Sequence, residues 1–389
     1  MTVSLIKRAY QVKHKLLEYG LEAFAADYAG IRAQIYAERE LGSDEETALR
    51  DWFVLEHQLP DHRSVLSHFI DCCTDGADQV IAEQWGIVIE GVFHVRALLA
   101  NNHFELMNLV NDVEYTVAGN PEELLALEKG EYIHARLLAH QDHHMFTGVI
   151  DRLPTRKKNE IYELVAEIQL HNPKMAFIDN MDRIAMAYRI QQDELQDFIA
   201  FFGDDEIVLS GRELNEKMRE FYHYRFFQKK QHDSGNTIAK VFQDRYHQPP
   251  LPPHFDFLEN LQSEPDIGVI YDKTEGMVFL LHYGRFREVF SQPGFRKNKQ
   301  YRQILQAYLE DGNISSLPFR RMAERYPAQT AEVFKALLKR KKFDISKDLQ
   351  ALIRRYKPME ELTHLTPSTI PTSVRSKTFL RSLKTRSKW

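Results

Sequence analysis

The hydrophobic pattern of this chain changes its period twice, and this change limits the fold more than any other feature. Up to residue 84, apolar residues such as Leu5, Tyr10, Leu16 and Leu17 recur at helical spacing. From Trp85 to about residue 155 the period is near 2, the spacing of strands, and beyond residue 156 it is helical again. We therefore expect an α+β fold that is predominantly helical and carries a small β-structured insert.

The β-structured region contains five segments of strand length. Asn101-Asn102 and Asn111-Asp112 suit tight turns because Asn and Asp tolerate positive φ, and Gln141-Asp142 lies where the last hairpin must reverse. Five short strands this close together predict a small closed or half-closed barrel of the SH3-like or OB-like kind, within residues 85–155. An open meander packed on helices is the alternative. The expected strands are 92–99, 104–110, 113–117, 132–138 and 145–151.

The rest of the chain divides by composition. Helical regions are expected over 1–84 and 156–246, with capping boxes at Ser43-Glu46 and Ser210-Glu213. The stretch HQPPLPPH, residues 247–254, predicts an extended linker and a domain boundary because its prolines cannot continue a helix. Residues 255–357 then read as a hairpin, 268–271 with 276–280, followed by helices. The last part, 358–389, is expected to be a basic tail that is disordered over 366–376.

Two stretches carry a resemblance to a known group of proteins. They are DWFVLEHQLPDHRSVLSHFI with GVFHVRALL, and FIAFFGDDEIVLSGREL with GVIYDKTEGMVFLLHYGRFREVF. These patterns resemble uncharacterised bacterial proteins related to those that carry a Cys-rich zinc motif like that of the SecA carboxyl terminus. That motif needs several cysteines and a histidine in close spacing, whereas this chain has only Cys72 and Cys73. The resemblance therefore implies no zinc role here.

Charge is distributed unevenly along the chain. Residues 335–389 hold 15 Lys and Arg against 4 Asp and Glu, a net charge of +11, whereas residues 1–334 sum to −16. The final segment, Arg375 to Trp389, has six cations and no acid, interleaved with Phe379, Leu380 and Leu383. Such a segment suits phosphates, an anionic membrane surface or the acidic body of another copy.

These features predict a non-catalytic accessory or regulatory binding protein that is associated with nucleic acid through its basic tail. Each cation would neutralise a phosphate without reading bases, and the barrel would be a second contact surface. We expect a cytoplasmic protein without cofactors or a membrane span, because no apolar run approaches about 20 residues. The predicted nucleic-acid-binding residues are Arg354, Arg355, Lys357, Arg375, Lys377, Arg381, Lys384, Arg386 and Lys388.

Histidines in HARLLAHQDHHMF support an alternative function. Because a turn is expected between them, His140 and His143 could meet and bind a metal, with Asp142 as a further ligand, and assist hydrolysis. Strand alternation, however, places His143 and His144 on opposite faces, and no known zinc pattern accompanies His134 or its neighbours. Solvated hairpin histidines are the favoured interpretation.

Other candidate chemistry is weaker. The chain contains no GxxxxGK[ST], GxGxxG or GxSxG motif, so usual nucleotide or serine-hydrolase chemistry is not indicated. Asp204-Asp205-Glu206 is interpreted as a solvated turn, and the aromatic segment Glu220 to Lys230 as a core-facing helix. Cys72 and Cys73 read as reduced thiols. A protein interaction module within a larger bacterial assembly is the third alternative function.

Overall fold

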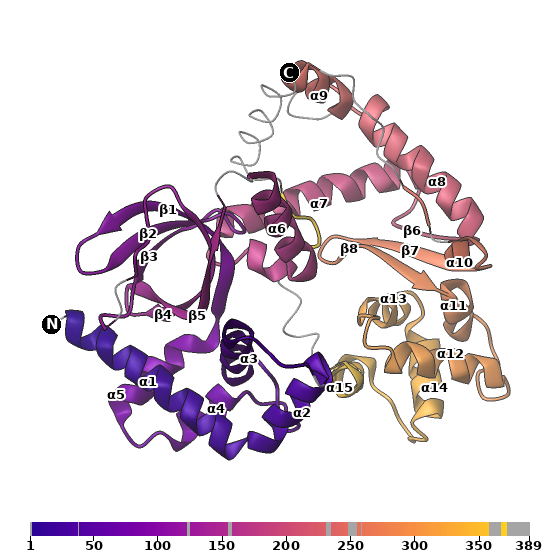
Figure 1. The fold of residues 1–389 in the computed structure, drawn as a ribbon. Coiled ribbons are helices and arrows are strands. Elements are labelled where there is room, and N and C mark those ends of the chain that lie inside the picture. The colour runs from indigo at the N-terminus through magenta and orange to yellow at the C-terminus, as the bar shows by residue number, and fades with distance from the viewer. Residues whose placement is uncertain are drawn as a thin grey trace. The chain divides into compact units, whose positions relative to one another are not determined.

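The chain divides into two compact units, Met1–Arg183 (unit 1) and Ile184–Trp389 (unit 2). The computed structural model describes residues 2–37, 39–122, 125–154, 158–230, 235–247, 255–257, 259–357 and 367–371. Unit 1 contains a five-stranded barrel and unit 2 a three-stranded sheet, and with the surrounding helices they make an α+β fold (Figure 1).

The barrel closes through five strand pairings. The order is β1-β2-β3-β5-β4, and β1 pairs with β4 to complete the ring. All pairings are antiparallel except the short one between β3 and β5, at Val117–His144 and Ala118–Met145. The strands are β1 (Val88–Leu99), β2 (His103–Asn108), β3 (Glu114–Ala118), β4 (Tyr132–His140) and β5 (His143–Leu153).

The expected strands and turns correspond to observed ones within a few residues. Asn101, Asn102, Asp112 and Gln141 all have positive φ, between 53° and 62°, at the three turns where the sequence placed them. Along β1, Phe93 and Val95 point into the barrel, while Val92 packs outside it against the helix that follows β5. The period of 2 therefore identified both faces of this strand.

Helices cover the barrel of unit 1 on two sides. One group packs its apolar residues, such as Phe53 and Trp85, against the barrel end formed by Val88, Leu138 and Met145. These elements are α1 (Thr2–Ala23), α2 (Ala25–Tyr36), α3 (Ser43–Leu55), α4 (Val65–Cys72), α5 (Gly76–Glu83) and η1 (Gln84–Gly86). A second group, α6 (Lys158–His171) and η2 (Pro173–Ala176), packs against Val92 and its neighbours.

The sheet of unit 2 joins segments from both sides of the proline-rich stretch. β6 (Glu206–Leu209) pairs with β7 (Ile267–Asp272), which pairs with β8 (Gly276–Leu281). The expected hairpin is β7–β8, whereas β6 was not expected as a strand. β6 and β7 lie on opposite sides of the linker and boundary expected at 247–254, yet they share one sheet, and the two compact units divide at Arg183. Residues 248–254 themselves lie outside the described ranges.

Helices lie on both faces of this sheet. Phe198 and Phe221 pack with Val269 and Tyr271 on one face, and Phe286 and its neighbours pack with Ile270 and Leu280 on the other. The first group is α7 (Met181–Phe202), α8 (Gly211–His223) and the π-helical η3 (Tyr224–Gln228). Two further helices of this unit, α9 (Ile238–Tyr246) and α10 (Glu259–Gln262), contribute no described side chain to this cluster. The second group is α11 (Tyr283–Ser291), α12 (Lys299–Glu310), α13 (Leu317–Arg325), α14 (Pro327–Leu337) and α15 (Ile345–Tyr356).

One segment near the C-terminus, residues 367–371, is described, and its Ser368 lies beside α7 and the β7–β8 turn. Ser368 donates from its hydroxyl to Gln191 Oε1 over 3.0 Å, and Pro367 and Pro371 are buried. Gly276 has a φ of +74°, and a Cβ there would lie 2.1 Å from Ser368 Oγ, so this approach requires glycine. Of the segment 366–376 that was expected to be disordered, residues 367–371 lie within the described ranges and the others lie outside them.

Candidate nucleic-acid interface

Three of the nine predicted nucleic-acid-binding residues lie in the described part of the chain. Arg354 and Arg355 occupy the last turn of α15, and both side chains are exposed. Lys357 follows as the C-cap of the same helix. The other six, Arg375, Lys377, Arg381, Lys384, Arg386 and Lys388, lie outside the described residues.

Lys357 is not positioned to meet a phosphate. Its residue is only 7% exposed, and its Nζ donates to the carbonyl oxygen of Asp311 over 2.7 Å. The ammonium also lies 5.9 Å from the centre of the Phe319 ring. The predicted role of Lys357 is therefore corrected: this cation fixes the end of α15 against its own domain.

The basic part of the chain begins before the tail and includes folded helices. Residues 283–357, which form α11–α15 and are named the basic module here, hold 18 Lys and Arg against 7 Asp and Glu, a net charge of +11. All of them lie within a described range. Phe286, Phe319 and Phe334 of the module form one apolar core together with Ile270 and Leu280 of the sheet. In the sequence, a count of charged residues that began at residue 283 would have revealed the basic module.

Most cations of the basic module are on its surface. Arg287, Arg321 and Lys335 are half-buried, and Lys357 is buried. The others are exposed. These exposed cations are Arg285, Arg296, Lys297, Lys299, Arg302, Arg320, Arg325, Lys339, Arg340, Lys341, Lys342, Lys347, Arg354 and Arg355.

The densest group of exposed cations is the turn Lys339–Lys342 between α14 and α15. Lys339 follows the C-cap of α14, Leu338, and adopts a left-handed conformation with φ 53°. Arg340 lies 3.7 Å from Asp348, a contact between an exposed and a half-buried side chain near the surface that contributes little. Lys341 and Lys342 form no ion pair with any residue that the structure describes. This turn therefore offers unneutralised charge to a polyanion.

Three further arginines of the module bind a carboxylate that the sequence analysis placed in a solvated turn. Glu206 begins β6, and its side chain is only 1% exposed. Its Oε1 accepts from Arg287 over 3.0 Å and from Arg325 over 2.8 Å, while its Oε2 accepts from the Tyr283 hydroxyl over 3.0 Å. The neighbouring Asp205 pairs with Arg321 over 2.8 Å. The solvated-turn interpretation is thus wrong for Glu206, whose buried side chain binds residues of α11 and α13 to the sheet.

The histidines predicted as metal ligands occupy the β4–β5 hairpin. His140 and His143 are direct cross-strand partners, as a ligand pair would need to be. Burial is the main cause that lowers the pKa of His140, and the nearby His143 lowers it further. Within the described ranges, however, no three His, Cys, Asp or Glu side chains are arranged to hold a metal ion. The metal-assisted hydrolase remains a prediction without a third ligand.

His134 of the same segment has a different environment. Its Nε2 lies 3.1 Å from Glu90 Oε1, and its Nδ1 lies 3.5 Å from Asp151 Oδ2. The hydrogen bond to Glu90 is the main cause that raises the pKa of His134. His144, in contrast, packs edge-on against Tyr115, with ring centres 4.8 Å apart, and burial lowers its pKa. The four histidines therefore do not form one site.

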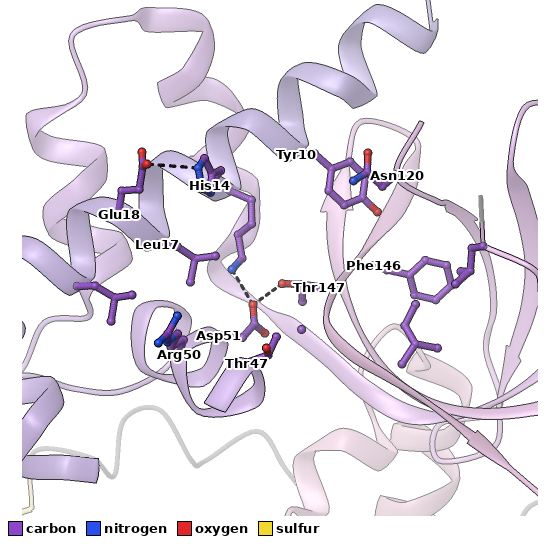
Figure 2. Close-up of a pocket in the computed structure, with 15 residues that line it drawn as sticks. Tyr10, His14, Leu17, Glu18, Thr47, Arg50, Asp51, Asn120, Phe146 and Thr147 are labelled. Atoms are coloured by element: carbon purple, nitrogen blue, oxygen red, sulfur yellow. Dashed lines mark hydrogen bonds and ion pairs between the residues drawn. The ribbon is translucent and has the colours of Figure 1, made fainter. Parts of the chain in front are cut away.

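A cleft in unit 1 lies between helices α1 and α3 and the barrel strand β5. It has a volume of about 520 Å³, and Figure 2 shows Asp51 on its helical side and Phe146 on its barrel side. Asp51 accepts from Lys13 over 2.6 Å, from Arg136 over 2.6 Å and from the Thr147 hydroxyl over 2.5 Å. Burial lowers the pKa of Lys13, against the opposing charge of Asp51.

These buried groups connect three parts of unit 1. Lys13 belongs to α1, Asp51 to α3, and Arg136 and Thr147 to paired positions of β4 and β5. Arg136 also binds Glu56, so two cations meet two carboxylates and the network is neutral. Because the network is satisfied internally, a ligand in the cleft would be held by its other walls, which are apolar at Leu17, Leu125 and Ile150.

The aromatic segment Glu220 to Lys230 belongs mainly to the core of unit 2. Phe221 is fully buried among Phe198, Phe201 and Phe202. Arg225 is held by Glu194 over 2.8 Å and Asp197 over 3.3 Å. The interpretation as a core-facing helix is confirmed for this part.

Comparisons with known proteins complete this description. Among the helices of the described ranges, none combines the length and apolar character that crossing a bilayer requires. No family model, curated protein or solved structure matches the chain. The resemblance to the SecA-motif-related bacterial proteins therefore stays a prediction.

Proposed function

We propose that this chain is a non-catalytic accessory protein that binds nucleic acid through the basic module and the cationic segment that follows it. The observation that carries the proposal is the net charge of +11 on the folded residues 283–357, most of whose cations are exposed. A basic surface of this kind binds a phosphate backbone by releasing counterions, without the need for a catalytic site.

The charge of the two units favours unit 2 as the interface. Residues 1–183 carry 17 Lys and Arg against 30 Asp and Glu, a net charge of −13, whereas residues 184–389 carry 34 against 26, a net charge of +8. A phosphate backbone would be repelled by unit 1, including its barrel, and attracted by the basic module. The second contact surface expected on the barrel therefore has no electrostatic support.

Individual cations then have separate roles. Arg354, Arg355 and the Lys339–Lys342 turn would neutralise phosphates on the folded surface. Arg375, Lys377, Arg381, Lys384, Arg386 and Lys388 would add further contacts from the terminal segment. Arg287, Arg321 and Lys357 hold the module together through Glu206, Asp205 and Asp311, so they contribute indirectly.

Binding of a fluorescent oligonucleotide by the purified full chain tests the proposal. We expect Lys341→Glu with Lys342→Glu to weaken binding at least tenfold, because two attractive contacts become repulsive. Lys174→Glu, an exposed cation of unit 1, is the matched control and should leave affinity within about twofold.

A second titration separates the nucleic acid from other polyanions. Vesicles that contain phosphatidylserine present negative charge without a strand, and we expect weaker binding to them than to the oligonucleotide. Preference for the vesicles, or equal loss of affinity in the Lys174→Glu control, would refute the proposed function.

A further inference from the structure

We infer that a hollow on the basic module receives an unpaired nucleobase, which makes single-stranded nucleic acid the preferred ligand of this surface. The hollow lies between the end of α11, the loop 291–298 and one face of α14, and its volume is about 360 Å³. The inference rests on the proposed function, because it names which form of nucleic acid that interface takes.

The floor of the hollow is apolar and is fixed by the core of the module. Val289 and Val333 are 0% and 4% exposed, and both line it. Gly294 forms part of the loop wall with a φ of +105°, a conformation that favours glycine and leaves no side chain in the space. A flat, weakly polar group fits such a floor.

The walls carry hydrogen-bonding groups without partners. Gln292 and Gln329 are exposed, and the side-chain amide of neither makes a hydrogen bond to any residue that the structure describes. Each amide offers both a donor and an acceptor, which is the combination that base edges present. Gln329 and Glu332 are three residues apart on α14, so they share one helical face.

The carboxylate of Glu332 favours a base over a phosphate as the occupant of the hollow. Lys335 donates to it over 2.8 Å, and this contact is the main cause that lowers the pKa of Glu332, with a further contribution from the charge of Arg296. The ionised carboxylate of Glu332 only accepts hydrogen bonds, so it offers a phosphate no donor. It accepts hydrogen bonds from amino groups, which cytosine, adenine and guanine carry and which uracil and thymine lack.

Cations beside the hollow would bind the backbone phosphates next to the inserted base. Arg296 and Lys297 are exposed on the loop that forms one wall, and the Lys339–Lys342 turn follows α14 directly. A strand could keep its backbone on these cations while one base enters the hollow. In a duplex the bases are stacked and paired, so this arrangement needs a single strand.

The test compares oligonucleotides with the same number of phosphates, using the full chain and fluorescence anisotropy. The probes are oligo-dC, oligo-dT, an abasic strand and a duplex, each of about 12 nucleotides, within the size of known single-strand sites. We expect oligo-dC to bind most tightly, about fivefold or more above oligo-dT, and the abasic strand about tenfold or more below oligo-dC. The duplex should also bind more weakly than oligo-dC.

Variants locate the effect in the hollow. Gln292→Ala with Gln329→Ala should reduce the affinity for oligo-dC toward that for the abasic strand, and should leave the abasic affinity unchanged. Glu332→Gln should remove the preference for oligo-dC over oligo-dT. Gln303→Ala, an exposed amide on α12 outside the hollow, is the matched control and should change neither.

The experiment distinguishes failure of the base-binding inference from failure of the proposed function. Equal affinity for oligo-dC and the abasic strand, or a double variant that behaves like Gln303→Ala, would overturn the base-binding inference and leave the proposed function standing. Absence of salt-dependent binding to all four probes would overturn the proposed function, and the inference with it.

Discussion

At the residue scale, burial decides which cations of the basic module are available to a ligand. Arg355 and Lys357 are two positions apart and carry the same charge, yet Arg355 is exposed while Lys357 donates to Asp311 and lies over Phe319. A sequence pattern treats both as members of one basic cluster. Their roles separate only when the turn of α15 and the packing of α13 are known.

This difference leads to paired predictions for the two residues. Lys357→Ala should lower the free energy of unfolding by about 1–3 kcal/mol, because a buried hydrogen bond and a packed stem are lost, and should change oligonucleotide affinity less than twofold. Arg355→Ala should leave the unfolding free energy within about 0.5 kcal/mol and weaken binding. Urea unfolding and anisotropy on both variants check this, and a reversed pattern would contradict the assignment.

His134 gives a prediction about pH. Its folded-state pKa is raised, chiefly by its hydrogen bond to Glu90, so the folded protein favours the protonated form. The stabilisation should be complete below the unfolded pKa of about 6.5 and should be lost as the pH rises through the folded pKa. The difference in unfolding free energy between the native chain and His134→Gln should therefore shrink above pH 6.5. A difference that is constant with pH would argue against the ion pair.

At the element scale, a buried network fixes the helices of unit 1 to its barrel. Asp51 of α3 receives hydrogen bonds from α1, β4 and β5 at once. Gly148 on β5 adds to this fit, because a Cβ there would lie 3.1 Å from Asp51 Oδ2, and its φ is +66°. The position of α3 is thus determined by charge pairing as well as by apolar contacts.

Replacing Asp51 should therefore destabilise unit 1 strongly. Asp51→Ala leaves Lys13 and Arg136 buried with one carboxylate fewer, and we expect a loss of about 3–5 kcal/mol in unfolding free energy. Arg50→Ala is the matched control, because Arg50 forms an exposed pair with Glu46 and should cost less than about 1 kcal/mol. Equal losses in chemical denaturation would show that the network does not contribute as described.

Much of the element pattern could be predicted from the sequence, because it depends on local spacing. The five barrel strands and the β7–β8 hairpin follow from alternation, and the capping box at Ser210-Glu213 is confirmed. The other expected box is off by one residue: the helix cap is Gly42, whose N–H donates to Glu45 over 3.0 Å. Glycine offers no side-chain signal at a cap, so the neighbouring serine was chosen instead.

The parts that could not be predicted depend on contacts between distant residues. β6 was not expected as a strand because it begins with the polar Glu206, whose burial is compensated by Arg287 and Arg325 from about 80 to 120 residues later in the chain. Likewise, the cleft network joins Asp51 to Arg136, 85 positions away. No local spacing reveals such pairs. The base-binding hollow also escaped prediction, since its walls come from two helices and a loop.

At the scale of the whole molecule, charge separates the two units. Unit 1 is acidic at −13 and unit 2 is basic at +8, and the basic module within unit 2 reaches +11. In the sequence, the excess of positive charge is clearest in the tail. In the structure, the positive charge of residues 283–357 lies on the folded helices α11–α15 and their connecting turns. A folded basic surface fixes the spacing of its cations, which a terminal segment alone does not do.

The most direct test of this account is the salt dependence of oligonucleotide binding by the full chain and by a chain that ends at Pro371. For a single strand, the logarithm of the binding constant should fall against the logarithm of salt concentration with a slope of about −0.7 for each phosphate contact. We predict that the shortened chain keeps a clear negative slope, smaller than that of the full chain, because the basic module remains. Complete loss of salt-dependent binding in the shortened chain would contradict the claim that the folded module is the interface.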